Sequence, residues 1–195
     1  MLSKESQEQT LQKLIKNIDI FSNSEYDVGM VNKVEATIKL SEKRFIAQKP
    51  YRCSPKDNKE IEKQIHNLLK AGIIEESTSA YAAPVTLAPT KEDGQCTGTR
   101  LVVDYCELNK TVVPEAQPFP HIEDLIIKCK NCKFFSVLDI RRAFSSVPLR
   151  EKDQHKTAFV TTSGHYQWRR LPFGFKNSPA IFQRILSNAI RTYGL

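Results

Sequence analysis

The segment from Phe134 to Leu149 constrains the fold and the function of this chain more than any other. Its first part, Phe134 to Leu138, is an apolar run rich in strand-forming side chains, and it ends at the carboxylate of Asp139. A buried strand that ends in a carboxylate delivers a charged group to the rim of a sheet. We therefore predict a buried strand over residues 134–138, with Asp139 at its end.

The residues after Asp139 indicate a change of conformation. Ile140 to Phe144 do not alternate between apolar and polar side chains, so they cannot continue the strand. We predict one short helical turn before Val147 and Pro148, which brings Asp139 and Phe144 near each other. A carboxylate at a strand end, followed by two arginines and an aromatic ring, suits a site that handles a metal-bound phosphate.

Five blocks of sequence, in the same order, resemble reverse transcriptases of Ty3/gypsy-type retrotransposons. Leu138-Asp139, with Phe144 and the run from Val147 to Leu149, is similar to the motif that carries the first metal-binding aspartate of that family. Blocks in a shared order are far more specific than a single motif. The other blocks are YAAPV at 81–85, RLVVDY at 100–105 with LNK at 108–110, KTAF at 156–159, and LPFGF with SPAIFQ between 171 and 183.

The resemblance implies an α+β fold of the right-hand polymerase type. Fingers and an incomplete palm would contain a mixed or antiparallel sheet with packed helices. The match covers roughly everything after Lys49. We therefore expect an N-terminal connector at residues 1–49, and a reverse transcriptase domain at residues 50–195 that is truncated before an Asp-Asp hairpin.

Apolar periodicity and capping residues predict where helices and strands lie. Ser54 is suited to cap a helix that runs to about Lys70, and Gly72 is suited to end it. Residues 121–128 predict a short helix packed behind the central sheet. The other expected elements are a helix around residues 11–18, a strand over 34–40, hairpin strands over 83–88 and 100–105 around a polar tip at 91–98, a second hairpin over 156–162 and 165–171, and a last helix from 177–179 to near Gly194.

The family resemblance implies a site for nucleotidyl transfer from a deoxynucleoside triphosphate (dNTP) to a primer. Asp139 would be a catalytic ligand to both of two divalent ions, usually Mg²⁺, with Mn²⁺ also possible. Phe144 would be the steric gate that excludes a ribose 2′-hydroxyl, although core packing is the commoner use of phenylalanine. Phe173 and Gly174 would belong to an apolar loop beside the nucleotide.

Two cations and one further carboxylate are candidates for nucleotide binding. Arg100, at the base of the first hairpin, and Lys91, at its tip, could neutralise a triphosphate. Arg100 would do so through bidentate hydrogen bonds and Lys91 as a point charge, whereas solvated surface charge is the alternative for both. Asp104 is either a nucleotide-binding neighbour of the site or a structural acceptor for turn amides.

The net charge favours a polyanionic partner. The chain has 29 Lys and Arg against 22 Asp and Glu, which gives a net charge of +7. Lys176, Arg169 and Arg170 are candidates for contacts with the phosphates of an RNA or DNA template and its primer, although a solvated hairpin face explains the two arginines equally well. The resemblance adds the remainder of a Pol polyprotein as a partner, namely thumb, RNase H and integrase.

Cellular location and cysteine chemistry are constrained more weakly. The polar amino terminus lacks the apolar core of a signal peptide, and no apolar run approaches a membrane span, so we expect a cytoplasmic or nuclear protein without a membrane partner. An odd number of cysteines without a secretion signal favours free thiols. Cys129 and Cys132 form a C-x-x-C pair that fits a turn better than zinc, because a second pair of ligands is missing.

One absence limits the expected activity. The family's second catalytic block, an aromatic-x-Asp-Asp hairpin, does not occur in these residues, and only Glu151 and Asp153 follow Asp139 among the acidic residues. One carboxylate cannot hold two Mg²⁺ ions. We therefore predict a reverse transcriptase segment of a retrotransposon polyprotein, inactive as this chain alone. The alternative is a non-catalytic nucleic-acid-binding remnant or domesticated fragment.

Overall fold

The chain is organised around a five-stranded mixed sheet. The structure is a computed structural model, and it describes residues 4–32, 34–42, 44–92 and 94–193. The strands lie in the order β1-β5-β4-β2-β3, and β2 pairs with β4 in parallel, whereas the other neighbours are antiparallel. The predicted α+β class is confirmed. The strands are β1 Ile74–Glu76, β2 Ala83–Glu92, β3 Gln95–Val103, β4 Phe159–Val160 and β5 His165–Trp168.

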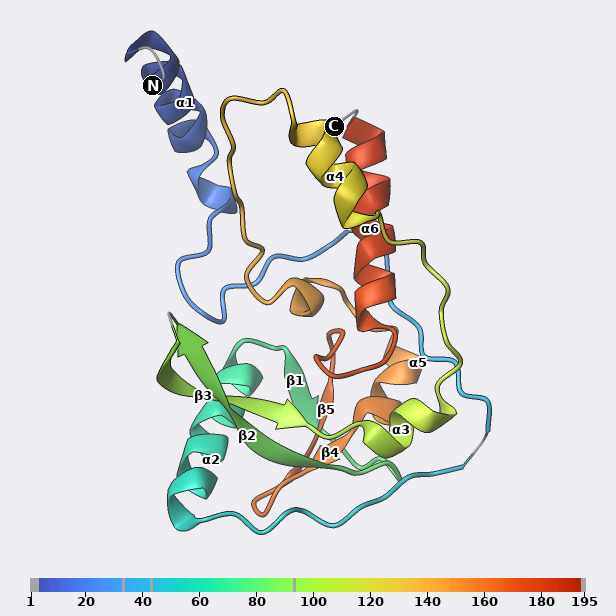
Figure 1. Ribbon diagram of the computed structural model, residues 1–195. Helices are drawn as coiled ribbons and strands as arrows, with labels where there is room; N and C mark the ends of the chain where they lie inside the picture. Colours follow the sequence, from blue (N-terminus) through green and yellow to red (C-terminus); the bar gives the residue numbers. More distant parts are fainter. Residues whose placement is uncertain (1–3, 33, 43, 93, 194–195) are drawn as a thin grey trace.

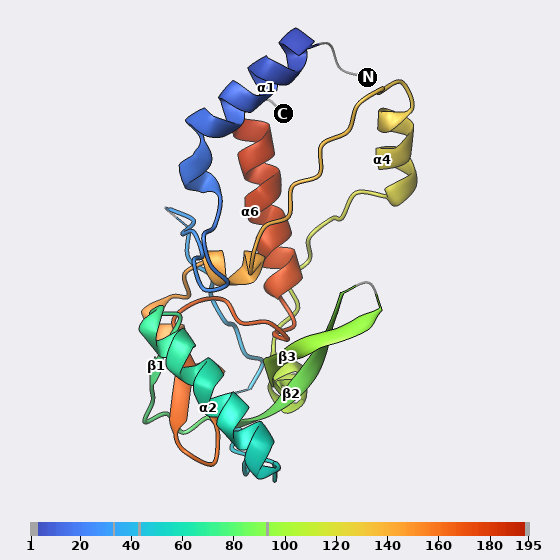
Figure 2. The ribbon, with the colours of Figure 1, turned by 90° about the vertical axis from the view of Figure 1, so that its left-hand side faces the viewer.

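Helices occupy both ends of the molecule. Helix α2 lies beside the sheet, whereas α1, α4 and α6 stand at the opposite end (Figures 1 and 2). No described helix is both long and apolar enough to cross a membrane. The helices are α1 Lys4–Lys16, α2 Pro55–Lys70, α3 Cys106–Thr111, α4 Ile122–Cys129, α5 Glu151–Gln154 and α6 Ser178–Tyr193, with short 3₁₀ turns η1 Ile18–Ile20, η2 Ala143–Ser146 and η3 His155–Thr157.

Helix α2 forms as its sequence predicts. The Ser54 hydroxyl accepts a hydrogen bond from the Asp57 backbone N–H at 3.1 Å, and Pro55 occupies the first helical position. Ile61, Ile65 and Leu68 are spaced on one face and are buried in the core. Burying one such side chain contributes about 1.5–3 kcal/mol, so this face anchors α2 to the rest of the molecule.

The first hairpin is longer than predicted. Strands β2 and β3 pair from Val85–Val103 out to Glu92–Gln95, with a bulge between Thr90 and Lys91. Residues 95–100 of β3 are exposed, and the polarity of residues 95–98 is why the sequence indicated a hairpin tip there. Backbone hydrogen bonds between two strands do not require apolar side chains, so the ladder continues past the part that covers the core.

The buried strand predicted over residues 134–138 is wrong. The segment has no regular secondary structure, and Val137 and Leu138 are 92% and 76% exposed. An extended segment becomes a stable strand only when a neighbour satisfies its backbone groups and covers its apolar face. No described strand pairs with this segment, so its apolar side chains stay exposed.

Three other predictions also need correction. Helix α4 forms at the predicted place, but it buries no residue and does not pack behind the sheet (Figure 2). Residues 34–40 make only isolated bridges, Ala36 to Leu149 and Leu40 to Val112, although Ala36 and Ile38 are buried as the alternation predicts. The second hairpin lies where the sequence predicts it, but its strands β4 and β5 are shorter than predicted. Helix α3 is an additional element that the sequence did not predict.

The end of α2 supplies a test of backbone strain. Gly72 has φ +64°, and a Cβ built there would meet only Arg169 Nη1, at 4.0 Å. We expect Gly72→Ala to lower the free energy of unfolding by about 1 kcal/mol, because an L-residue pays a steric cost in the left-handed region. Urea unfolding measures this difference.

Gly29 provides the matched control for that measurement. Its added Cβ would meet no atom within 4 Å, and its φ lies outside the left-handed region. Gly29→Ala should therefore stay within about 0.5 kcal/mol of the wild type. Equal effects of the two substitutions would contradict the assignment of the cost to the Gly72 backbone.

Candidate functional site

One cavity gathers four of the residues that the sequence assigned to a nucleotide site. It has a volume of about 550 Å³ and lies between β3 and the segment 139–145. Four predicted residues line it, although Arg100 and Phe173 are 73 positions apart in the sequence; the four are Arg100, Asp139, Phe144 and Phe173. The predicted nearness of Asp139 to Phe144 is consistent with this arrangement.

Aromatic rings and one guanidinium form a connected wall of this cavity. The Arg100 guanidinium lies over the Phe173 ring at 4.6 Å from its centroid, a cation–π contact. The Phe173 and Phe144 rings are stacked with centroids 6.2 Å apart, and Phe144 meets Phe182 of α6 edge-on at 5.9 Å. Arg100 makes no ion pair with any described residue, so its charge is available to an anion.

The turn η2 gives Phe144 its position. It is the helical turn that the sequence predicts after Asp139, and it is closed by hydrogen bonds from Ser145 N to Arg142 O at 2.8 Å and from Val147 N to Phe144 O at 3.0 Å. Val147 is fully buried and anchors the end of the turn in the core. The ring of Phe144 is thereby held at the cavity wall by a rigid local structure.

Asp139 reaches the cavity from the unpaired segment. Among the described residues, the other carboxylate that lines the cavity is that of Glu25, which is ion-paired with Arg142. Within the described residues, no group of three or more His, Cys, Asp or Glu side chains could hold a metal ion. The described residues therefore do not fit the pair of Mg²⁺ ions expected for this family, because Asp139 alone lacks the necessary partners.

Glu25 and Arg142 are two charged cavity residues that sequence reasoning did not assign to the site. The sequence indicated two arginines after Asp139, but it did not say which of them would face a site. Glu25 lies 117 residues away from Arg142 in the sequence. No local signal identifies such a pair, since only the folded chain brings it together.

Asp104 lies outside the lining of this cavity. Its carboxylate accepts hydrogen bonds from the Tyr51 hydroxyl at 2.7 Å and from the Cys106 backbone N–H at 2.9 Å. The Cys106 thiol, the Tyr51 hydroxyl and that backbone N–H together lower the pKa of Asp104 below its ordinary value. This geometry matches the structural alternative, an acceptor for turn amides, at the start of α3.

The two arginines that follow β5 have different surroundings. Arg169 pairs with Glu75 at 3.6 Å and is largely exposed. Arg170 has its Nη1 buried without a hydrogen bond to any described residue, and burial followed by the charge of Arg169 lowers its pKa. Neither lines the cavity, and a role for them in template binding stays a prediction.

Asn109 fixes the loop that precedes α6. Its side chain donates to the Gly174 carbonyl at 2.9 Å and accepts from the Lys176 backbone N–H at 2.8 Å. Gly174 has φ +82°, and an added Cβ would lie 3.4 Å from the Val103 carbonyl, so glycine suits this close approach. Lys176 is exposed, and the side chain of Lys91 lies outside the part of the chain that the structure describes.

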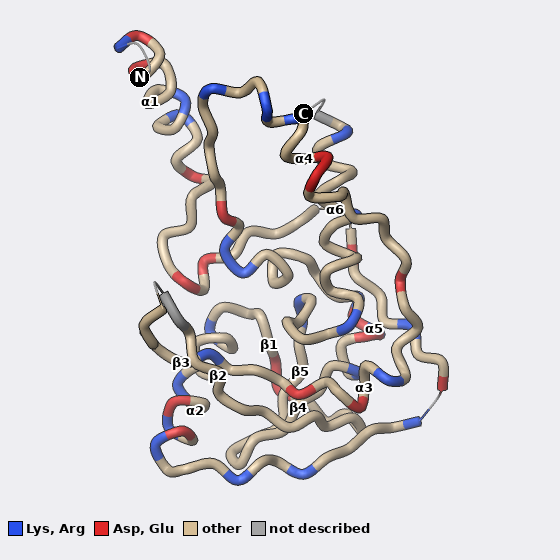
Figure 3. The backbone as a smooth tube through the Cα atoms, in the orientation of Figure 1, with Lys and Arg blue, Asp and Glu red and all other residues tan. Residues whose placement is uncertain are grey.

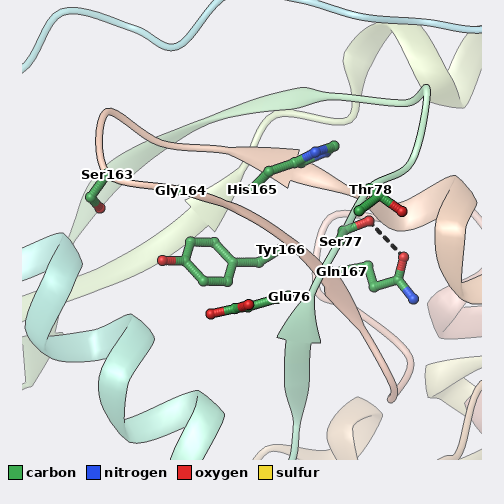
Figure 4. A pocket seen from close by; sticks show the side chains of 8 residues that line it. All are labelled: Glu76, Ser77, Thr78, Ser163, Gly164, His165, Tyr166 and Gln167. Atoms are coloured by element: carbon green, nitrogen blue, oxygen red, sulfur yellow. Dashed lines mark hydrogen bonds between the residues drawn. The ribbon is translucent and has the colours of Figure 1, made fainter.

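A second cavity, of about 430 Å³, contains none of the predicted site residues. It lies between the end of β1 and the turn that joins β4 to β5 (Figure 4). Tyr166 and Glu76 lie beside each other there, whereas His165 points away from them and its Nε2 is 2.9 Å from the Tyr81 carbonyl.

Basic and acidic residues are interspersed along the backbone (Figure 3), so charge alone does not single out either cavity.

The chain belongs to the reverse transcriptase (RNA-dependent DNA polymerase) family. The family match covers residues 89–194, which is more than half of the chain. The chain is also 34% identical, over 191 residues, to the retrovirus-related Pol polyprotein from transposon 297 of Drosophila melanogaster. That alignment covers 95% of this chain but 18% of the polyprotein, so the chain spans a small part of its relative.

Solved structures show the same fold. The protease-reverse transcriptase of prototype foamy virus is 29% identical in sequence to this chain, with a TM-score of 0.85. The match covers 98% of this chain and 25% of the viral chain. The foamy viral enzyme in complex with double-stranded DNA is 28% identical in sequence to this chain, with a TM-score of 0.79. This match covers 98% of this chain and 33% of the viral chain. The α+β polymerase fold predicted from the sequence is confirmed.

The contacts of Asp104 supply a test by pH titration. We expect Tyr51→Phe to raise the pKa of Asp104 towards its ordinary value, because the variant loses a hydrogen bond that stabilises the carboxylate. Since the folded-state pKa is lowered, the associated stabilisation is present above the ordinary pKa and is lost as the pH falls through the folded-state pKa. Carboxyl NMR titration measures the shift.

Tyr26→Phe is the matched control for that titration. The Tyr26 hydroxyl makes no hydrogen bond to a described residue, and Tyr26 contacts Arg142 through its ring. The pKa of Asp104 should be unchanged in this variant. An unchanged pKa in Tyr51→Phe as well would show that the hydroxyl contributes nothing to the lowered value.

Proposed function

We propose that this chain is the nucleotide-binding part of an RNA-directed DNA polymerase from a retrotransposon Pol polyprotein. The observation that carries the proposal is the single cavity lined by Arg100, Asp139, Phe144 and Phe173, in a chain of the reverse transcriptase family. A guanidinium without a protein partner suits phosphate, and adjacent aromatic rings suit a sugar and a base. The preferred ligand is therefore a deoxynucleoside triphosphate.

Each cavity residue has a proposed role. Arg100 binds the triphosphate, and the Phe173 ring holds the Arg100 guanidinium through a cation–π contact. Phe144, stacked on Phe173, lies against the sugar as a steric gate. Asp139 is proposed as a ligand to Mg²⁺ in the assembled polyprotein. Because the described residues do not form a two-metal site, they account for nucleotide binding and not for the transfer step.

The proposed macromolecular partners are a primed template and the rest of the Pol polyprotein. The net charge of +7 and the complex of the foamy viral enzyme with double-stranded DNA support a nucleic-acid partner. We also propose residues 1–49 as a connector and residues 50–195 as the polymerase domain. Ala36 and Ile38 of the connector are buried in the common core, so the two parts fold together.

Nucleotide binding can be followed through the single tryptophan, Trp168, which lines the same cavity. We expect Arg100→Ala to weaken dATP binding about ten-fold, the effect of losing a charge-assisted hydrogen bond at a partly exposed site. Arg52→Ala is the matched control, because Arg52 is exposed and does not line the cavity. Equal loss in both variants would indicate general electrostatic attraction instead of a site.

The gate role of Phe144 predicts a change in sugar discrimination. We expect Phe144→Val to reduce the ratio of the ATP and dATP dissociation constants, because a smaller side chain leaves room for the 2′-hydroxyl. Phe119→Val is the control, since Phe119 is 55% exposed and lies outside the cavity lining. An unchanged ratio in Phe144→Val would leave Phe144 with a packing role.

Primer extension tests the catalytic limit of the chain. The purified 195-residue protein should extend a primed RNA or DNA template no faster than a blank, with Mg²⁺ or Mn²⁺ present, because one free carboxylate cannot hold two metal ions. A complete reverse transcriptase serves as the positive control. Extension above the blank would overturn this prediction, whereas template binding with a steep salt dependence and no nucleotide binding would favour the non-catalytic binding module.

A further inference from the structure

Arg142 has a backbone conformation that is unusual for its residue type. Its φ and ψ are 47° and 48°, and it is the one non-glycine residue with positive φ among those that the structure describes. The left-handed region is unfavourable for a long side chain, so surrounding contacts must hold the residue there. Residues held in such conformations concentrate at binding sites, which makes the surroundings of Arg142 informative.

The N-terminal segment holds the Arg142 side chain on two sides. Arg142 Nε donates to the Glu25 carbonyl at 3.1 Å, and Nη2 is ion-paired with the Glu25 carboxylate. The guanidinium also lies over the Tyr26 ring at 4.6 Å from its centroid. Next to this contact, Val31 N donates to Ser146 O at 2.8 Å and ties the segment to η2.

These contacts leave part of the guanidinium unused. A guanidinium has five N–H donors, and Glu25 engages only the edge formed by Nε and Nη2. Arg142 Nη1 donates to no described residue, and the side chain remains 26% exposed. An arginine that is fixed on one edge and stacked on a ring loses little further freedom when its other edge binds an anion.

Arg142 and Arg100 line the same cavity from different elements. Arg100 belongs to β3 and makes a cation–π contact with Phe173. Arg142 precedes η2 and makes a cation–π contact with Tyr26. A polyphosphate carries several negative charges along its length, so it can engage two separate cations at once. Neighbouring Arg141, by contrast, is exposed and does not line the cavity.

We propose that Arg142 is a second phosphate-binding residue of this cavity, positioned by Glu25 and Tyr26, with a nucleoside polyphosphate as the ligand. The inference rests on the proposed nucleotide site and deepens it, because it assigns a phosphate contact to Arg142 and not to Arg141, the other arginine between Asp139 and Phe144. It also gives the N-terminal segment an indirect part in ligand binding, because Glu25 and Tyr26 position Arg142.

The test compares ligands that differ only in their phosphates. Dissociation constants of deoxyadenosine, dAMP and dATP are measured through Trp168 fluorescence, with and without Mg²⁺, for the full chain. Arg142→Asn is the informative variant, because asparagine tolerates the left-handed backbone conformation of this position. Arg141→Asn is the matched control.

We expect Arg142→Asn to weaken dATP binding about ten-fold, dAMP binding less, and deoxyadenosine binding not at all. Arg141→Asn should leave all three unchanged. An equal loss for the three ligands, with an unchanged melting temperature, would overturn the proposal, because it would mean that Arg142 only shapes the cavity. An unchanged dATP affinity in Arg142→Asn would also overturn it.

The positioning role of Tyr26 has its own readout. Tyr26→Leu removes the ring below the guanidinium and should reduce the preference for dATP over deoxyadenosine about two- to three-fold, whereas Tyr26→Phe should retain that preference. Equal preferences in the two variants would remove the positioning role.

Failure of this inference can be told apart from failure of the proposed function. If the wild type does not prefer dATP over deoxyadenosine, both proposals fall. If it does prefer dATP, and Arg100→Ala removes the preference while Arg142→Asn keeps it, the nucleotide site stands and only the role of Arg142 is wrong.

Discussion

The hydrogen bonds of Thr157 connect the segments on which the sheet and the cavity depend. Thr157 is fully buried, its hydroxyl donates to Gln154 O at 2.7 Å and accepts from Trp168 N at 3.1 Å, and its carbonyl accepts from the buried Tyr105 hydroxyl at 2.7 Å. Buried polar groups left without partners are costly, so these bonds allow few other arrangements. They join the end of β3, the turn before β4, and β5 into one unit.

The same unit explains why the cavity walls stay in place. Tyr105 follows β3, which carries Arg100, and Trp168 lines the cavity from β5. Asn109 then fixes the loop of Phe173 to α3 through its bonds to Gly174 and Lys176. The walls that carry Arg100 and Phe173 are therefore supported by the core, whereas Asp139 enters from a segment that the core does not cover.

Sequence reasoning worked best where a local rule was sufficient. The Ser54 cap, the apolar face of α2 and the turn at η2 depend on residues a few positions apart, and all three form as predicted. The motif blocks also named four residues that one cavity now unites. Prediction failed for the strand over residues 134–138, because a run of apolar, strand-forming side chains indicates a preference for pairing but does not supply the partner strand.

The sequence by itself determined the family, the polymerase fold and the identity of Arg100, Asp139, Phe144 and Phe173 as site candidates, because ordered motifs and short-range periodicity are written along the chain. Only the tertiary structure decided that Asp104 accepts hydrogen bonds from Tyr51 and Cys106, that Arg142 lines the cavity and Arg141 does not, and that Glu25 pairs with Arg142. These outcomes depend on contacts between segments far apart in the sequence and on which backbone groups find hydrogen-bond partners. No local sequence pattern encodes such contacts or such pairings.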